Sequence, residues 1–197
     1  MRMIILGPPG AGKGTQAARI AEQRAIPAIS TGDIFRANIA NETELGLQVK
    51  EILDSGGYVT DEVTNAIVRD RLTQPDASTG FLLDGYPRTV GQVEALDEML
   101  ADQGAGLDSV LELVVDTDEV VQRLLARAQE QGRADDTEEV IRARMDKYTE
   151  ETAPLAQVYR ERGLLRQVDG MGTVEEVSAR IQEALDTRTN GVNGSAL

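Results

Sequence analysis

A glycine-rich stretch near the N-terminus limits what this chain can fold into more than any other feature. Residues 7–15 read GPPGAGKGT, directly after the apolar run MRMIIL, and lead into the Ala-rich segment KGTQAARIAEQ. A buried strand, a glycine loop and a helix in this order aim backbone amides at a bound anion. The stretch therefore predicts a phosphate-binding loop in an α/β fold.

One residue of this loop departs from the usual phosphate-loop pattern, G-x-x-x-x-G-K-[ST]. Gly14 follows Lys13, and the hydroxyl of Thr15 comes one position late. In the usual pattern this hydroxyl holds a magnesium ion. The amides of residues 10–15 can still surround the phosphates of a nucleoside triphosphate while Lys13 reaches the transferred group.

The remaining chain alternates between strand-like and helical patterns. Further strands are expected at residues 27–30, 80–84, 110–116 and 164–169. Apolar residues at helical spacing form three faces between them, made by Val63, Ile67, Val68 and Leu72, by Val120, Leu124 and Ala128, and by Val174, Val177, Ile181 and Leu185. This alternation predicts one domain over residues 1–187, with a parallel sheet covered by helices on both faces.

Two segments do not fit simple crossovers between strands. Residues 30–59 hold two helical patterns without a strand between them, which indicates a small helical insertion. Residues 126–136 include the polar run RAQEQGRADD, and we interpret both segments as flaps or as ordinary surface excursions. The tail at 188–197 lacks periodicity, and we expect it to be disordered.

Composition excludes several classes of mechanism. The 197 residues include no Cys and no His, so a thiolate zinc site, a disulfide and an imidazole base are all ruled out. A net charge of -14 argues against general nucleic-acid binding, which depends on neutralising phosphates. Apolar runs stay well short of the roughly 18 residues of a membrane span. We therefore expect a cytoplasmic protein that acts on small molecules.

Two aspartates at the ends of expected strands are candidates for magnesium. Asp84 follows GFLL, and Asp116 follows LELVV. Ligands of parallel sheets gather at the carboxyl ends of the strands. Asp84 is favoured because the run DGYPR brings a glycine and an arginine to the same edge.

Four motifs in this order resemble adenylate kinases: GPPGAGKGTQA, STGDIFR, GFLLDGYPR and GRADD followed by RARMDKY. The resemblance extends from Met1 to about Leu185. It implies a three-layer α/β/α P-loop kinase fold with a five-stranded parallel sheet, a monophosphate-binding insertion at 30–59 and a short lid at 126–136. In that family the loop reads GKGT, so the glycine after the lysine is expected.

The resemblance also implies a role for individual residues. Those implied for ATP are Gly10, Ala11, Gly12, Lys13, Gly14, Thr15, Arg123, Arg127 and Gly172. Those implied for AMP are Thr31, Arg36, Gly57, Tyr58, Val59, Gly85, Tyr86, Pro87, Arg88, Gln92, Arg133 and Arg144. The charges implied to assist the transfer are Lys13, Arg88, Arg127, Arg133 and Arg144. Magnesium would come with ATP, with Asp84 acting on it through water.

Several of these residues also fit plainer interpretations. Thr89 and Gln92 have the spacing of a helix capping box. Arg123 and Arg127 lie four apart, as a solvated pair on one helix face would. Arg142 is expected in solvent and Arg144 nearer the face of Ile141, Met145 and Tyr148.

The lid implied by the resemblance is of the short type. Only five residues separate Arg127 from Arg133, which leaves no room for the extra hairpin and zinc cysteines of longer relatives. No structural zinc is expected.

The expected activity is reversible transfer of the γ-phosphoryl group of ATP to AMP, giving two ADP, by a monomer. A uridylate or cytidylate kinase is the nearest alternative, and Thr31 in STGD favours AMP because pyrimidine-specific relatives tend to have a smaller residue there. A nucleotide-switched binding protein of the GTPase type is another. The sequence lacks the N-K-x-D guanine motif of that class. A GTPase function would also leave the arginines of the expected site unexplained.

Overall fold

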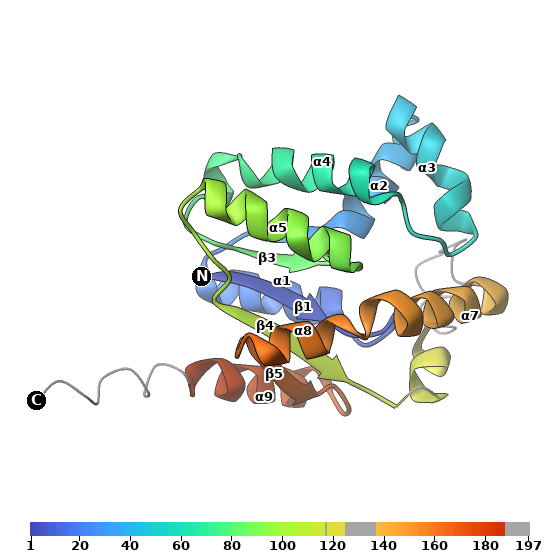
Figure 1. Cartoon of the computed structure of the whole chain (residues 1–197). Coiled ribbons are helices and arrows are strands. Elements are labelled where there is room, and N and C mark those ends of the chain that lie inside the picture. Colours follow the sequence, from blue (N-terminus) through green and yellow to red (C-terminus); the bar gives the residue numbers. More distant parts are fainter. Residues whose placement is uncertain (117, 125–136, 188–197) are drawn as a thin grey trace, which may run out of the picture.

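A computed structural model describes residues 1–116, 118–124 and 137–187 (Figure 1). Five strands in these residues form one parallel sheet in the order β2-β3-β1-β4-β5. They are β1 (Arg2–Leu6), β2 (Ala28–Ser30), β3 (Phe81–Asp84), β4 (Ser109–Val114) and β5 (Leu165–Asp169). The five-stranded parallel sheet expected from the sequence is confirmed, and each strand lies within or close to its expected range.

Helices connect these strands along the chain. They are α1 (Lys13–Arg24), α2 (Thr31–Ala40), α3 (Glu44–Asp54), α4 (Asp61–Leu72), α5 (Val90–Asp102), α7 (Glu138–Lys147), α8 (Leu155–Glu161) and α9 (Val174–Asp186). A 3₁₀ turn, η1 (Pro75–Ala77), precedes β3, and a π-helical turn, η2 (Tyr148–Thr152), joins α7 to α8. None of the described helices has the length and apolar character needed to cross a lipid bilayer.

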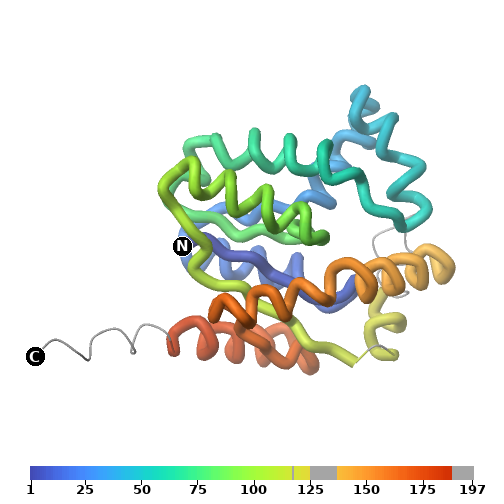
Figure 2. Tube along the Cα trace, in the orientation of Figure 1, coloured from blue at the N-terminus to red at the C-terminus, as the bar shows by residue number. Residues whose placement is uncertain are grey.

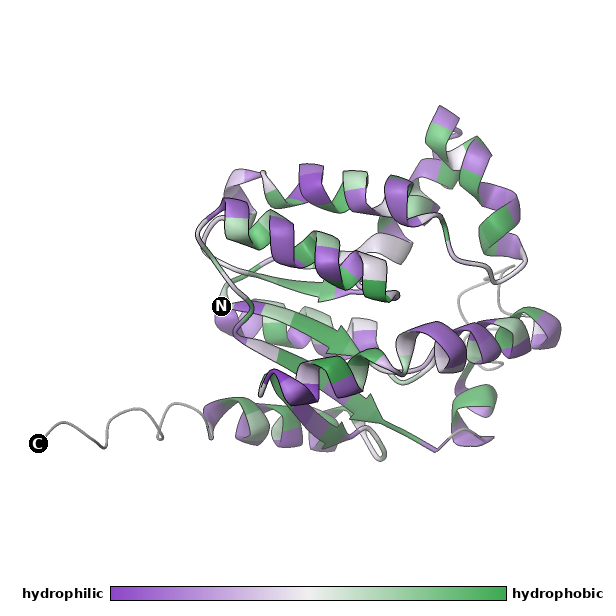
Figure 3. Ribbon diagram, in the orientation of Figure 1, coloured by the Kyte–Doolittle hydropathy of each residue, from purple (hydrophilic) through white to green (hydrophobic). Residues whose placement is uncertain are grey.

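Helices cover both faces of the sheet, with α4 and α5 on one side and α9 on the other (Figure 1). Side chains along a strand alternate between the two faces. Accordingly, Ile4 and Leu6 of β1 join the hydrophobic cluster formed with α4, α5 and α8, whereas Met3 and Ile5 join the cluster formed with α1 and α9. Burial on both faces explains why β1 is apolar from Met3 to Leu6. Figure 3 shows the central strands mainly in green, the colour of hydrophobic residues, between helices that carry both colours.

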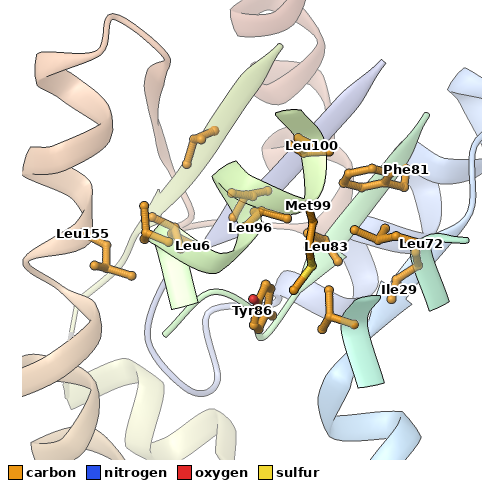
Figure 4. Packing of buried hydrophobic residues seen from close by; sticks show 14 of the residues in the cluster. Leu6, Ile29, Leu72, Phe81, Leu83, Tyr86, Leu96, Met99, Leu100 and Leu155 are labelled. Atoms are coloured by element: carbon orange, nitrogen blue, oxygen red, sulfur yellow. The ribbon is translucent and has the colours of Figure 1, made fainter. Parts of the chain in front are cut away.

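The cluster on the first face is the larger part of the core. Figure 4 shows Leu96 and Leu100 of α5 packed over Phe81 and Leu83 of β3. Tyr86 closes the end of this cluster and is 1% exposed. The chain that leaves β3 is thereby anchored in the core just before it reaches the edge of the sheet.

Helices α2 and α3 form a pair that projects from the sheet (Figures 1 and 2). They cross closely, since a Cβ at Gly46 would lie 2.2 Å from the carbonyl oxygen of Asn38. Phe35, Val49 and Val59 form a small cluster of their own beneath this pair. The two helices follow one another without a strand between them, as the sequence predicts.

The apolar faces expected on α4 and α9 are largely found, with two differences. On α4, Val68 and Leu72 pack into the main core, whereas Val63 and Ile67 pack against the small cluster of the projecting pair. The face expected on α9 is buried except for Val174, which is 39% exposed. Val174 is the first residue of α9.

Candidate active site

The carboxyl ends of the central strands surround a cavity of about 600 Å³. The strand β1 pairs with β3 on one side and with β4 on the other, so the loops after β1 and β3 meet at the point where the strand order reverses. Open parallel sheets bind ligands at this point. The expected site residues that line the cavity are Gly10, Gly12, Lys13, Gly14, Thr15, Thr31, Arg36, Gly57, Tyr58, Val59, Asp84, Gly85, Pro87, Arg88, Gln92, Arg123 and Arg144.

The glycine loop forms one wall of this cavity. Gly10 and Gly12 have left-handed backbones, with φ of 81° and 86°. A Cβ at Gly10 would lie 2.8 Å from Cγ of Leu124, so the loop packs closely on the segment after β4. Gly12 is the N-cap of α1 and has no side chain to accept from the helix amides, which leaves these donors for an anion.

Lys13 lies across this loop. Its Nζ donates to the carbonyl oxygens of Gly7 at 2.8 Å and of Pro8 at 3.0 Å. These contacts hold the ammonium group beside the amides of the loop. The loop and Lys13 together present donors and positive charge to a polyphosphate.

Asp84 reaches the end of the same loop. Its Oδ2 lies 3.6 Å from the position that a Cβ of Gly14 would occupy. Asp116, the other candidate for magnesium, accepts from the amides of Asp118 at 2.9 Å and Glu119 at 3.3 Å. Asp116 therefore caps the helical turn that follows it, and only Asp84 of the two lines the cavity.

A carboxylate at this position suits magnesium. Mg²⁺ keeps several waters in its shell and is usually bound through one or two carboxylates together with the phosphates of the substrate. The described residues include no group of three or more acidic side chains that could enclose a metal ion by themselves. The absence of zinc stays a prediction.

Arg88, from the turn that follows β3, forms part of a second wall of the cavity. Its Nε donates to the carbonyl oxygen of Gly85 at 2.8 Å. Its guanidinium carbon lies 4.7 Å from the centre of the Tyr58 ring. The left-handed backbone of Gly85, with φ of 80°, brings its carbonyl oxygen under the side chain, and a Cβ there would meet Arg88 at 3.1 Å.

Burial lowers the pKa of Arg88 from its ordinary value. Tyr58 and Asp84 oppose this change in pKa. The nearby positive charges of Arg144 and Arg36 add to it. Arginine stays protonated under all these influences, so this wall concentrates positive charge where a phosphate would relieve the repulsion.

Gln92 is fixed by two hydrogen bonds. Its Oε1 accepts from the amide of Arg88 at 2.7 Å, and its Nε2 donates to Oδ1 of Asp61 at 2.8 Å. Thr89 caps α5 by accepting from the amide of Gln92 at 3.2 Å. Gln92 does not return this bond to Thr89, so half of the expected capping box forms and the amide group of Gln92 is held beside the cavity.

Thr31 and Arg36 come from the first helix of the projecting pair. Thr31 is 2% exposed, and its hydroxyl donates to the carbonyl oxygen of Gly85 at 2.9 Å. Arg36 lines the cavity and forms an ion pair with Asp33 one turn before it. The monophosphate-binding insertion expected from the sequence therefore contributes a hydroxyl and a guanidinium to this wall.

A family model described as adenylate kinase matches residues 5–164 of the chain. The chain belongs to the adenylate kinase family. Curated adenylate kinases of Nocardioides sp. and Kocuria rhizophila are 63% and 62% identical to it, each over 94% of this chain, and cover 97% and 98% of their own lengths. An adenylate kinase of Thermobifida fusca is 56% identical over 95% of this chain and all of its own length. Members of this family are phosphotransferases that use ATP with Mg²⁺, and the chain is an enzyme of this class.

Some residues implied by the likeness to adenylate kinases lie away from the cavity or outside the described part. The side chains of Ala11 and Tyr86 are buried in the two large clusters. Gly172 follows β5 and does not line the cavity. Arg127 and Arg133, with the rest of the expected lid, lie outside the described residues.

The arginines on either side of the expected lid differ in their surroundings. Arg144 lines the cavity, whereas Arg142 is 75% exposed and pairs with Glu138. Arg123 also lines the cavity, pairs with Glu119 and donates to the carbonyl oxygen of Gly170 at 3.4 Å. The preference for Arg144 over Arg142 as a residue near the site agrees with these positions.

Sequence reasoning missed several residues of the cavity wall, and Tyr148 and Thr152 are two of them. They follow Arg144 at intervals of four residues, which places all three on one side of a helix. This spacing is a signal that could have found them. Both lie in η2, directly behind the helix that carries Arg144.

Proposed function

We propose that this adenylate kinase family member transfers the γ-phosphoryl group of MgATP to the α-phosphate of AMP, reversibly, giving two ADP. The observation that carries the proposal is the arrangement of two anion-binding walls around one cavity. The glycine loop and Lys13 form one wall, and Arg88, Arg36 and Arg144 lie on the other. Two phosphorylated substrates bound to these walls would meet within the cavity.

The residues at this site can assist the transfer without a general base. The attacking oxygen of AMP is already an anion, so no proton must be removed from it. Catalysis then depends on holding donor and acceptor in line and on compensating charge on the transferred group. We assign these tasks to Lys13, Arg88 and Arg144 in the described part, and to Arg127 and Arg133 in the lid.

ATP would lie along the glycine loop. The amides of residues 10–15 and Lys13 would hold its phosphates, and Mg²⁺ would bridge them and neutralise part of their charge. Asp84, beside Gly14, would hold a water molecule of the Mg²⁺ shell. Arg123, next to the β5–α9 turn, would lie against the adenine, whose edge would meet the backbone of Gly172.

AMP would lie against the opposite wall. Arg36 and Arg88 would bind its phosphate, and Gln92 and Thr31 would face its base. The fixed amide of Gln92 supports this assignment, because its Nε2 keeps one hydrogen and its Oε1 one lone pair for a purine edge. The backbone at Gly57, Val59 and Pro87 completes the wall.

A comparison of acceptors tests the proposal. ATP and Mg²⁺ are mixed with AMP, CMP, UMP or GMP in turn, and diphosphate formation is followed by phosphorus NMR. We expect ADP to form rapidly with AMP and slowly or not at all with the other three. Preferred formation of CDP or UDP would assign the chain to pyrimidine nucleotides, and no transfer to any of the four would overturn the proposal.

This reaction would place the enzyme in adenine nucleotide homeostasis and purine salvage. Its monomeric state and cytoplasmic location, which the sequence led us to expect, stay predictions, as does the absence of nucleic-acid and membrane partners.

A further inference from the structure

Tyr58 makes contacts that the proposed transfer does not require of it. It follows α3 in the connection to α4. The face of its ring lies against the guanidinium of Arg88, 4.7 Å from the ring centre to Cζ. The electron-rich face of an aromatic ring attracts a cation at this distance.

The hydroxyl of Tyr58 is tied to the same arginine through a second residue. It lies 2.9 Å from Oγ1 of Thr152, and Thr152 donates its hydrogen to the carbonyl oxygen of Arg88 at 2.9 Å. A threonine hydroxyl has one hydrogen to donate, so the hydroxyl of Tyr58 must be the donor to Thr152. Thr152 is 5% exposed, which shields both bonds from water.

These contacts fix Arg88 at both ends. The ring of Tyr58 restrains the guanidinium, and Thr152 restrains the backbone of Arg88. The Nε of Arg88 is already used by the carbonyl oxygen of Gly85, so its two Nη groups are left to face an anion. An arginine held in this way loses little further freedom when it binds a phosphate.

The contacts also join two parts of the chain that are 94 residues apart. Tyr58 belongs to the segment behind the projecting helices, and Thr152 ends η2, behind α7. The two parts meet again at Gly56, where a Cβ would lie 3.0 Å from the carbonyl oxygen of Val140 and 3.2 Å from Cγ of Arg144. On this side the ring of Tyr58 also lies 5.9 Å from Nζ of Lys147.

We propose that Tyr58 is a positioning residue for Arg88, acting through its ring on the guanidinium and through Thr152 on the backbone. The proposal rests on the proposed function, in which Arg88 binds the phosphate of AMP and the transferred group. Tyr58 then makes the placement of Arg88 depend on the contact between the projecting helices and the α7–η2 segment.

Steady-state kinetics of Tyr58→Leu, Tyr58→Phe and Thr152→Val test this. Tyr58→Leu removes both contacts, and we expect kcat to fall about tenfold, which corresponds to about 1.4 kcal/mol of barrier. The KM for ATP should stay unchanged, because the glycine loop is untouched. Tyr58→Phe keeps the ring over Arg88 but loses the hydroxyl, and Thr152→Val keeps the size of the side chain but loses its hydrogen bonds. In each of these variants kcat should therefore fall less than in Tyr58→Leu. Arg162→Met is the matched control, since Arg162 also lies over a tyrosine ring, Tyr159, but away from the cavity.

An NMR readout separates positioning from general damage. The Nε–H resonance of Arg88, assigned by its loss in Arg88→Lys, should carry a ring-current shift in the parent enzyme. This shift should persist in Tyr58→Phe and disappear in Tyr58→Leu. If Tyr58→Leu does not fold, the test rests on the kcat values of Tyr58→Phe and Thr152→Val and on the ring-current shift of the Arg88 Nε–H resonance in Tyr58→Phe.

The outcomes distinguish this proposal from the proposed function. Failure of the parent enzyme to transfer phosphoryl groups would overturn the proposed function. The role of Tyr58 alone would be overturned if the parent is active and Tyr58→Leu keeps the full kcat. Equal increases in the KM values of Tyr58→Leu for ATP and AMP, with no change in its kcat, would overturn it as well.

Discussion

Individual residues of the site combine burial with positive charge. The pKa of Arg88 is lowered mainly by burial, yet the side chain keeps its proton. Its Nε donates to the carbonyl oxygen of Gly85, and its side chain lines the cavity. A buried cation is costly unless an anion joins it. The buried positive charge of Arg88 therefore favours a bound phosphate over water in this part of the cavity.

At this scale we predict the effect of Arg88→Ala. Turnover should fall on the order of a hundredfold or more, about 3 kcal/mol of barrier, because a donor to the transferred group is lost. Arg142→Ala changes the charge equally at a 75% exposed position and should leave kcat unchanged. Near-normal turnover in a folded Arg88→Ala would refute the role of Arg88, and circular dichroism would confirm that the variant is folded.

The elements of the site depend on close backbone packing at a few points. Helices α2 and α3 approach each other at Gly46, where there is no space for a side chain between the backbones of the two helices. This contact sets how closely the two helices of the projecting pair approach each other. The pair has only a small cluster of its own to stabilise it.

Gly46→Ala should therefore push the two helices apart. We expect a loss of about 1–3 kcal/mol of folding free energy, as for other overpacked contacts, together with a higher KM for AMP. Gly106→Ala is the control, since nothing lies within 4 Å of a Cβ at that glycine. Urea denaturation and AMP kinetics measure the two effects, and parent-like values for Gly46→Ala would show that the helices can separate without loss.

Helix capping offers a second prediction for the elements. Thr173 and Glu176 form a complete capping box at the start of α9, whereas Thr60 at the start of α4 makes no side-chain cap bond. Thr173→Ala should lower the free energy of unfolding by about 0.5–2 kcal/mol. Thr60→Ala should lower it less. Equal losses in urea denaturation would contradict the role of the capping box.

The whole molecule must exclude water from the transferred group, since an open site would hydrolyse ATP. We expect the projecting helices to close over AMP and the expected lid to close over ATP. Helices α3 and α7 lie at the same end of the molecule (Figure 1). Leu47 of α3 is 66% exposed and Arg142 of α7 is 75% exposed, so both accept a label.

We predict that the distance between labels at Leu47→Cys and Arg142→Cys shortens most when ATP and AMP, or a bisubstrate analogue, bind together. The chain has no cysteine of its own, so labelling is specific. Each nucleotide alone should produce a smaller change, which provides the control. Distance distributions from pulsed electron spin resonance that stay the same with the analogue would contradict closure.

Much of the site was predictable because its signals are local. The loop, its helix and the strands depend on spacing and on apolar periodicity, which neighbouring residues carry in the sequence. The separation of Arg144 from Arg142 followed in the same way from helical spacing. Asp84 was preferred over Asp116 because of the residues next to it, and it lines the cavity.

Sequence alone determined the class of this protein, through a phosphate loop set between a strand and a helix and through motifs that place it among adenylate kinases. Tertiary structure decided which side chains do what around the cavity. Tyr86 packs into the core instead of lining the site, and Tyr58 reaches Thr152 across 94 residues. The physical reason is that local patterns report periodicity and propensity, whereas contacts between distant segments exist only once the sheet and its helices have packed.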